Sequence, residues 1–119
     1  MTQILYSPAS PYSAKVRMAA AYADIPFDSV IVTTSAEPEN LVNANPLGKI
    51  PTLITDDGKS VFDSRAIMQY LNRISGNKIF PRNAEKRTDA ERYEAIADGL
   101  ADVLLAHVYE RRPVPDGNA

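Results

Sequence analysis

Nine prolines divide this 119-residue chain into short segments, so each helix and strand has to fit between them. Proline suits the first turn of a helix, and it disfavours helical geometry in the residue before it. Pro8 follows an apolar run at residues 4–6, which we predict to be a buried strand. A helix is predicted at residues 11–24, with Pro11 in its first turn and Pro26 just beyond its end.

The middle of the chain combines short strand patterns with turn residues. A strand is expected at residues 27–32, and any helix at residues 37–45 has to be short because Pro38 and two asparagines interrupt it. Residues 52–54 and 61–62 flank the sequence Asp-Asp-Gly-Lys, which is typical of a hairpin turn. These patterns predict an antiparallel strand pair after the first strand–helix–strand unit.

Two longer helices are predicted in the second half. Ser64 can cap the first, and Gly76 ends it. Its apolar residues share one face: Ile67, Tyr70, Leu71 and Ile74.

The second helix is expected at residues 84–111. It carries one mostly apolar stripe: Tyr93, Ile96, Ala97, Leu100, Leu104 and His107. The preceding helix can cover only part of this stripe, so we expect the rest to drive association with other protein surface. We expect His107 to be a hydrogen-bonded core residue. Asp98 and Asp102 share a face of this helix, and the sequence leaves open whether they meet a partner, a cleft or solvent.

The order of these elements predicts the fold class. A strand–helix–strand unit, a hairpin and a covering helix give a mixed sheet flanked by helices, which is an α/β fold. A chain of 119 residues is long enough for one domain and too short for two full domains.

Composition excludes several classes of function. The formal net charge is −2, so we expect no nucleic-acid partner. The apolar stretches are too short to cross a bilayer, so no membrane association is expected. The chain has no cysteine and one histidine, which excludes disulfides, thiolate zinc sites and a cysteine nucleophile and predicts no metal site. The absence of cysteine favours a cytoplasmic setting.

Three motifs carry a family resemblance. Residues 10–13 (Ser-Pro-Tyr-Ser) resemble the glutaredoxin Cys-Pro-Tyr-Cys site with serine at both cysteine positions, and the basic–apolar–basic pattern at 15–17 is similar to serine-type glutathione transferases. Residues 45–51 (Asn-Pro-Leu-Gly-Lys-Ile-Pro) resemble that family's loop into a cis-proline. Residues 62–67 (Phe-Asp-Ser-Arg-Ala-Ile) resemble its acidic-plus-serine motif at the third helix, and 97–100 resemble the start of its all-helical domain.

The resemblance to glutathione transferases implies a division into domains. Residues 1–77 are expected to form a thioredoxin-like βαβ-α-ββα domain, and residues 78–84 a linker. Residues 85–119 are expected to be the start of an all-α second domain, represented here by one long helix. Members of the family continue through several more helices, so we expect this chain to be a fragment of a longer protein.

The resemblance also implies a glutathione site. Asp63 is expected to bind the free amine, and Ser64 to bind the γ-glutamyl carboxylate at the positive end of a helix. If the bond between Ile50 and Pro51 is cis, the backbone of Ile50 can pair with the cysteinyl residue of glutathione as a strand would. Lys49 is expected to attract the glycine carboxylate.

Ser10 is expected to activate the glutathione thiol, because its hydroxyl lies where a redox enzyme keeps its nucleophilic cysteine. As a serine it cannot form a disulfide, which favours transfer over thiol exchange. Tyr6 is the rival residue, since other transferase classes use a tyrosine at the end of the first strand. Ser13 is expected only to fill the first turn of the helix.

The resemblance therefore implies a glutathione transferase that joins glutathione to a small electrophile in detoxification and works as a homodimer. One alternative is a non-catalytic module of the same fold that binds glutathione or a protein in a stress or regulatory role. Another is a glutathione-dependent reductase or isomerase. Glutathione is the co-substrate in each catalytic case, and no metal is implied.

Overall fold

The structure is a computed structural model that describes residues 1–32, 43, 45 and 48–111. Most of the short helix expected at residues 37–45 lies outside this description, as do the side chains of residues 109 and 111. The described elements are, in order, β1 (Gln3–Tyr6), α1 (Pro11–Tyr22), β2 (Asp28–Ile31), β3 (Thr52–Ile54), β4 (Ser60–Val61), α3 (Ser64–Ile74) and α4 (Ala84–Arg111).

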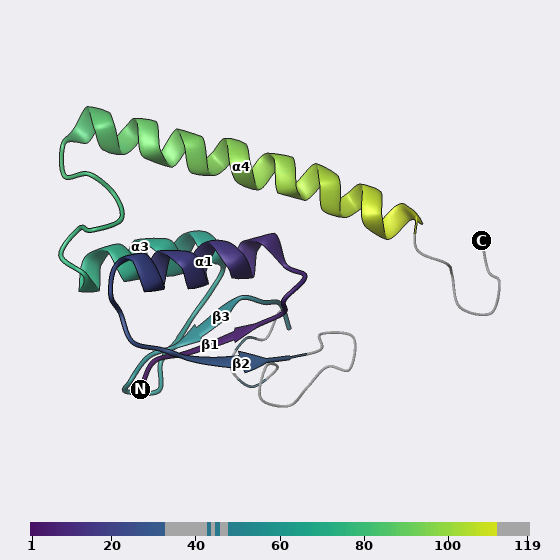
Figure 1. Cartoon of the computed structure of the whole chain (residues 1–119), viewed down its shortest axis with the longest axis horizontal. Helices are drawn as coiled ribbons and strands as arrows, with labels where there is room; N and C mark the ends of the chain where they lie inside the picture. Colours follow the sequence, from purple (N-terminus) through teal and green to yellow (C-terminus); the bar gives the residue numbers. More distant parts are fainter. Residues whose placement is uncertain (33–42, 44, 46–47, 112–119) are drawn as a thin grey trace.

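The four strands form one mixed sheet in the order β2–β1–β3–β4. β1 is parallel to β2 and antiparallel to β3, and β3 is antiparallel to β4. Parallel neighbours need a crossover connection, which α1 provides. α1 and α3 lie side by side on one face of the sheet, and α4 lies beyond them (Figure 1). The predicted α/β, thioredoxin-like arrangement followed by one long helix is confirmed.

The main core lies between the sheet and the helices α1 and α3. Its largest fully buried apolar side chains are Ile4, Val16, Leu53, Ile67 and Leu71. Neighbouring residues of a strand point to opposite faces, so Leu5 belongs to a smaller cluster on the other face, with Val32. Burying each large apolar side chain contributes about 1.5–3 kcal/mol, so the core fixes which face of the sheet receives the helices.

Two helix boundaries differ from those predicted. α1 ends at Tyr22, two residues early, because the chain turns at Asp24, whose φ is +58°. The expected cap at Ser64 is wrong: Asp63 is the N-cap of α3, and its side chain accepts a hydrogen bond from the backbone N–H of Arg65 at 3.1 Å. Ser64 is instead the first residue of the helix. A carboxylate and a hydroxyl both cap helices well, and the sequence alone does not rank two neighbours.

The segment between α3 and α4 packs onto the domain through Asn72. This side chain is fully buried, and its oxygen accepts hydrogen bonds from the backbone N–H groups of Ile79 and Phe80 at 3.1 and 2.8 Å. Its amide donates to the side-chain oxygen of Asn77 at 3.1 Å. Phe80 joins the main core. These contacts fix where the chain leaves the domain to enter α4.

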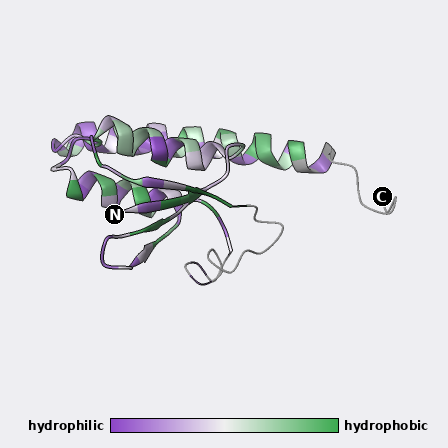
Figure 2. Ribbon diagram, turned by 60° about the horizontal axis from the view of Figure 1, so that its bottom comes forward, coloured by the Kyte–Doolittle hydropathy of each residue, from purple (hydrophilic) through white to green (hydrophobic). Residues whose placement is uncertain are grey.

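α4 has the bounds that the sequence predicts, and its second half projects beyond α1 and α3 (Figure 1). Hydrophobic residues recur along this projecting part (Figure 2). The apolar stripe faces away from the domain, and Tyr93, Ile96 and Leu100 are each at least 60% exposed. Although α4 has 28 residues, neither it nor another described helix is apolar enough to span a bilayer.

The expectation that His107 lies in a core is wrong, because the side chain is exposed. His107 does lie on the apolar stripe of α4. In the described part of the chain, however, no other element packs against that stripe. Ile67 and Leu71, which were expected to cover part of it, are instead fully buried in the core beneath α3.

Candidate functional site

Strand register brings the three motifs of the sequence to one end of the sheet. Leu5 of β1 pairs with Thr52 of β3, so the end of β1 lies beside the residues that enter β3. Leu53 pairs with Val61 of β4, so the residues that leave β4 lie at the same end. The start of α1 follows β1, and the start of α3 follows β4. Two helix N-termini and the loop before β3 therefore meet there.

Ser10 is the N-cap of α1 and is partly exposed. Its hydroxyl accepts a hydrogen bond from the backbone N–H of Ser13 at 3.1 Å. Ser13 does more than fill the first turn: it is fully buried, and its hydroxyl accepts the N–H of Ser7 at 3.4 Å. This second bond ties the loop after β1 to the helix. The Ser10 hydroxyl thus sits at the positive end of the α1 dipole.

The loop before β3 contains a cis peptide bond between Ile50 and Pro51, as predicted. Pro51 is buried, and Lys49 is exposed. The carbonyl oxygen of Lys49 accepts hydrogen bonds from the Thr52 hydroxyl at 2.8 Å and from the Asn45 amide at 3.1 Å. These bonds hold the backbone of the loop in place and leave the Lys49 ammonium group in solvent.

Asp63 and Ser64 open α3 at the same end of the sheet. Asp63 is exposed, and one of its carboxylate oxygens serves as the helix cap described above. A carboxylate has room for several hydrogen bonds, so Asp63 can also accept from a cationic amine. Ser64 is buried, with 5% of its surface exposed. The arrangement offers negative charge beside free backbone N–H groups, which suits a zwitterionic amino-acid end.

Comparison with known proteins identifies the family. Residues 9–74, which include the helix start at Ser10, the cis-proline loop and the start of α3, match the model of the glutathione S-transferase N-terminal domain. The chain belongs to the glutathione S-transferase family. This result confirms the resemblance drawn from the three motifs.

Individual relatives match most of this chain. A glutathione S-transferase from Methylobacillus flagellatus KT, solved with GSH bound, is 41% identical with a TM-score of 0.86, over 100% of this chain and 60% of that one. The uncharacterized GST-like protein YibF of Escherichia coli K12 is 29% identical over 86% of this chain and 51% of its own length. A stringent starvation protein A homolog of Pasteurella multocida is 27% identical over 86% and 60%. The chain spans half to three fifths of these relatives.

α4 contacts α1 and α3 through charged side chains. Lys15 of α1 donates to both carboxylate oxygens of Asp98 at 2.9 and 3.0 Å and to Glu94 at 3.0 Å. Arg65 of α3 lies 3.4 Å from the same Asp98 carboxylate. Of the two aspartates whose surroundings the sequence left open, Asp98 is 4% exposed and buried against Lys15 and Arg65, whereas Asp102 is exposed. Removing one partner of such a buried pair leaves the other charge uncompensated, at a cost of about 3–5 kcal/mol.

A second polar contact lies nearer the start of α1. The Tyr12 hydroxyl donates to the carboxylate of Asp102. Partial burial is the main cause that raises the pKa of Tyr12 to about 12, and the hydrogen bond to Asp102 and the negative charges of Asp102 and Asp98 add to it. Tyr12 therefore stays protonated, and remains a hydrogen-bond donor, throughout the neutral range.

The sequence alone assigns no function to Tyr12, Lys15 or Asp98. A usable signal was present, because residues 94, 98 and 102 form an acidic row at four-residue spacing on α4. Residues 12 and 15 provide donors at matching helical spacing on α1. Such rows also occur on solvated helix faces, so only the packing of the two helices reveals the contact.

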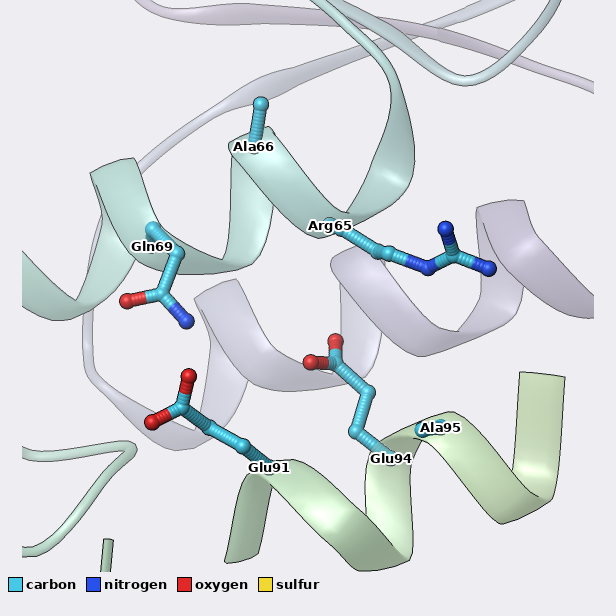
Figure 3. Close-up of a pocket in the computed structure, with 6 residues that line it drawn as sticks. All are labelled: Arg65, Ala66, Gln69, Glu91, Glu94 and Ala95. Carbon is cyan, nitrogen blue, oxygen red and sulfur yellow. The ribbon is translucent and has the colours of Figure 1, made fainter. Parts of the chain in front are cut away.

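A cleft of about 300 Å³ lies between α3 and α4 (Figure 3). Arg65 and Gln69 line it from α3, and Glu91 and Glu94 from α4. Gln69 also accepts a hydrogen bond from Arg87, which spans the two helices. Neither here nor elsewhere in the described part of the chain do three or more potential metal ligands come together.

Tyr6, the rival thiol-activating residue, is packed rather than open. It is 8% exposed and belongs to the main core. The guanidinium carbon of Arg17 lies 3.9 Å from the centre of its ring. Ser10 is more accessible than Tyr6 at the end of the sheet where the motifs meet.

Proposed function

We propose that this chain binds glutathione and that Ser10 activates the glutathione thiol for transfer to a small electrophile. The observation that carries the proposal is the meeting of the Ser10 helix start, the cis-proline loop and the Asp63–Ser64 helix start at one end of the sheet. The glutathione S-transferase that is 41% identical over the whole chain was solved with GSH bound, which supports the same ligand here.

Each end of glutathione has a complementary group in the site. In the proposal, the Asp63 carboxylate binds the α-amine, and the Ser64 end of α3 binds the γ-glutamyl carboxylate through backbone N–H groups and the helix dipole. The backbone of Ile50, beside Pro51, pairs with the cysteinyl residue. The Lys49 ammonium attracts the glycine carboxylate.

Thiol activation requires a modest pKa shift. A free thiol has a pKa near 8.5, so only a few per cent is ionised at neutral pH. Each unit of lowering corresponds to about 1.4 kcal/mol, which one charge-assisted hydrogen bond from the Ser10 hydroxyl can supply with help from the α1 dipole. Because serine cannot exchange disulfides, this chemistry favours conjugation of the thiol.

The proposal predicts that bound glutathione is a thiolate near neutral pH. Titrating the chain with glutathione should produce the ultraviolet absorbance of the thiolate at a pH one to two units below that of free glutathione. The S-methyl derivative of glutathione, whose sulfur cannot ionise, is the matched control. If glutathione binds saturably but the pKa of its thiol is unshifted, thiol activation by Ser10 is ruled out, whereas glutathione binding by this chain stands.

A second candidate function has one observation in its favour. The stringent starvation protein A homolog matches 86% of this chain, so a non-catalytic stress or regulatory module of the same fold is the alternative. It predicts binding of glutathione or a protein without thiol ionisation. A glutathione-dependent reductase or isomerase would instead share the ionised thiol and differ in the second substrate.

We further propose that residues 1–77 form the glutathione-binding domain, that 78–84 link it to α4, and that residues 85–119 begin a helical second domain. The exposed stripe of α4 and the greater length of the relatives support this division. In a homodimer, the stripe would also meet apolar surface of the partner.

The exposed stripe predicts that the 119-residue chain self-associates at micromolar concentration. Replacing Leu100, which is 60% exposed, by Glu should shift the sedimentation profile towards monomer, because a charge opposes burial of the stripe. Thr88→Glu, on an exposed polar position of α4, is the control. A stable monomeric wild type that binds no hydrophobic dye would contradict this prediction.

A further inference from the structure

The two basic residues that flank Val16 in α1 have different surroundings. Lys15 is neutralised by Glu94 and Asp98 of α4, at 3.0 Å or less. Arg17 pairs with no carboxylate in the part of the chain that the structure describes, and its Nε is buried without a hydrogen-bond acceptor. An arginine placed this way keeps its full charge and an unused donor, which a protein seldom retains without a partner.

The guanidinium group of Arg17 is held in position by an aromatic ring. It stacks over Tyr6 with 3.9 Å between the guanidinium carbon and the ring centre. Tyr6 is the last residue of β1 and is itself in the core, so the platform is rigid. The side chain of Arg17 is partly exposed, which leaves the outer part of the cation open to a ligand.

Helix geometry places this cation on the Ser10 side of α1. Arg17 follows Ser13 by four residues and lies on the same helix face. Side chains of a helix lean towards its N-terminus, so Arg17 extends back over the turn that contains Ser13. The backbone N–H of Ser13 donates to the Ser10 hydroxyl, and the Ser13 hydroxyl accepts from Ser7. Ser10 precedes Arg17 by seven residues, so the two share a face of α1 and are separated by two turns, about 10 Å along the helix.

We propose that Arg17 binds the carboxylate of the second substrate, so that this chain selects anionic electrophiles. This inference rests on the proposed function, because it places the second substrate beside the thiol at Ser10. The planar guanidinium group presents paired donors that match the two oxygens of a carboxylate. The Tyr6 ring occupies one face of the guanidinium plane, so the ligand approaches along the edge, where the N–H groups point.

The test compares two ligands that differ only in charge and do not react with thiols. The dissociation constants of 4-nitrobenzoate and 4-nitrobenzamide are measured by calorimetry with the full chain and saturating S-methylglutathione. Wild type should bind the carboxylate at least about ten-fold more tightly than the amide, as expected for a charge-assisted hydrogen bond. Equal affinity for the two ligands would overturn the proposal.

Three variants locate the preference. Arg17→Gln should abolish the preference for the carboxylate. Arg17→Lys should retain part of this preference, because lysine keeps the positive charge but lacks the paired N–H donors. Arg73→Gln removes the same charge from an exposed position of α3 and should leave the preference unchanged. A preference that persists in Arg17→Gln would assign it to another cation. If Arg17→Gln does not fold, the wild-type comparison and Arg17→Lys still decide the question.

Failure of the proposed function is recognised separately. A titration of wild type with glutathione alone reports on the Ser10–Asp63 site and involves neither nitrobenzoate nor nitrobenzamide. If glutathione does not bind, the proposed function fails, whereas the ligand pair, repeated without S-methylglutathione, still decides whether Arg17 prefers carboxylates.

Discussion

Replacing Ser10 by alanine should leave the affinity for glutathione within a few-fold and reduce turnover, in a form that carries the proposed helical second domain, by about 100-fold or more. The peptide contacts of glutathione are expected at Asp63, Ser64 and Ile50, whereas Ser10 would interact with the ionised sulfur. In the 119-residue chain, the same change should return the pKa of the bound thiol towards its free value. The ultraviolet absorbance of the thiolate and steady-state rates with a chromogenic electrophile measure the two effects.

Because Ser10 is also the N-cap of α1, the alanine variant loses about 1 kcal/mol of helix stability as well. Ser10→Asp is the matched control: aspartate caps a helix equally well, but its negative charge opposes a thiolate. It should fold like wild type and still fail to ionise the thiol. Tyr6→Phe should do little, and loss of activity in Tyr6→Phe with retention in Ser10→Ala would transfer the assignment to Tyr6.

Replacing Asp63 by alanine should weaken glutathione binding by about 1.5–3 kcal/mol, the range for a hydrogen bond to a charged group. In the proposed site, this carboxylate is the counter-charge of the γ-glutamyl amine. Calorimetric titration measures the change directly. Unchanged affinity would remove the amine-binding role from this position.

Asp63 has a structural role too, so its variants need a second control. Asp63→Asn keeps the capping hydrogen bond to the Arg65 N–H but loses the charge, and it should bind glutathione weakly while unfolding at the temperature of wild type. Asp28→Asn removes an exposed carboxylate at the opposite end of the sheet and should change neither property. Equal loss of affinity in both asparagine variants would indicate a general charge effect.

Much of the fold was predictable because its signals are local. Proline positions, turn residues and helical spacing gave the element order, and α4 was predicted with both of its ends. The cis bond before Pro51 is different, because it was implied by the resemblance of residues 45–51 to the family's loop and not by local propensity. The bounds of the helices and strands depend on a few neighbouring residues, so they can be predicted without knowing what packs against them.

Features that depend on packing between distant segments were not predictable in the same way. The spacing of α4 identified an apolar stripe correctly, yet the domain contacts the opposite, acidic side of the helix through Lys15 and Tyr12. Asp98 is therefore buried and His107 exposed, the reverse of what hydropathy indicates. For the candidate site, the sequence located the motifs and the register brought them to one end, and the roles of Ser10 and Asp63 remain predictions.

The charged contact between α1 and α4 has a consequence for how the two helices are aligned. Tyr12 and Lys15 meet Asp102 and Asp98 in reverse order, as antiparallel helices require. Sliding α4 by one turn, about 5.4 Å, would place Ala106 opposite Tyr12 in one direction and leave Lys15 with a single carboxylate in the other. Apolar side chains would tolerate such a slip at little cost, whereas these donors and acceptors match in one alignment. Whatever follows α4 in a longer chain therefore starts from one defined position relative to Ser10.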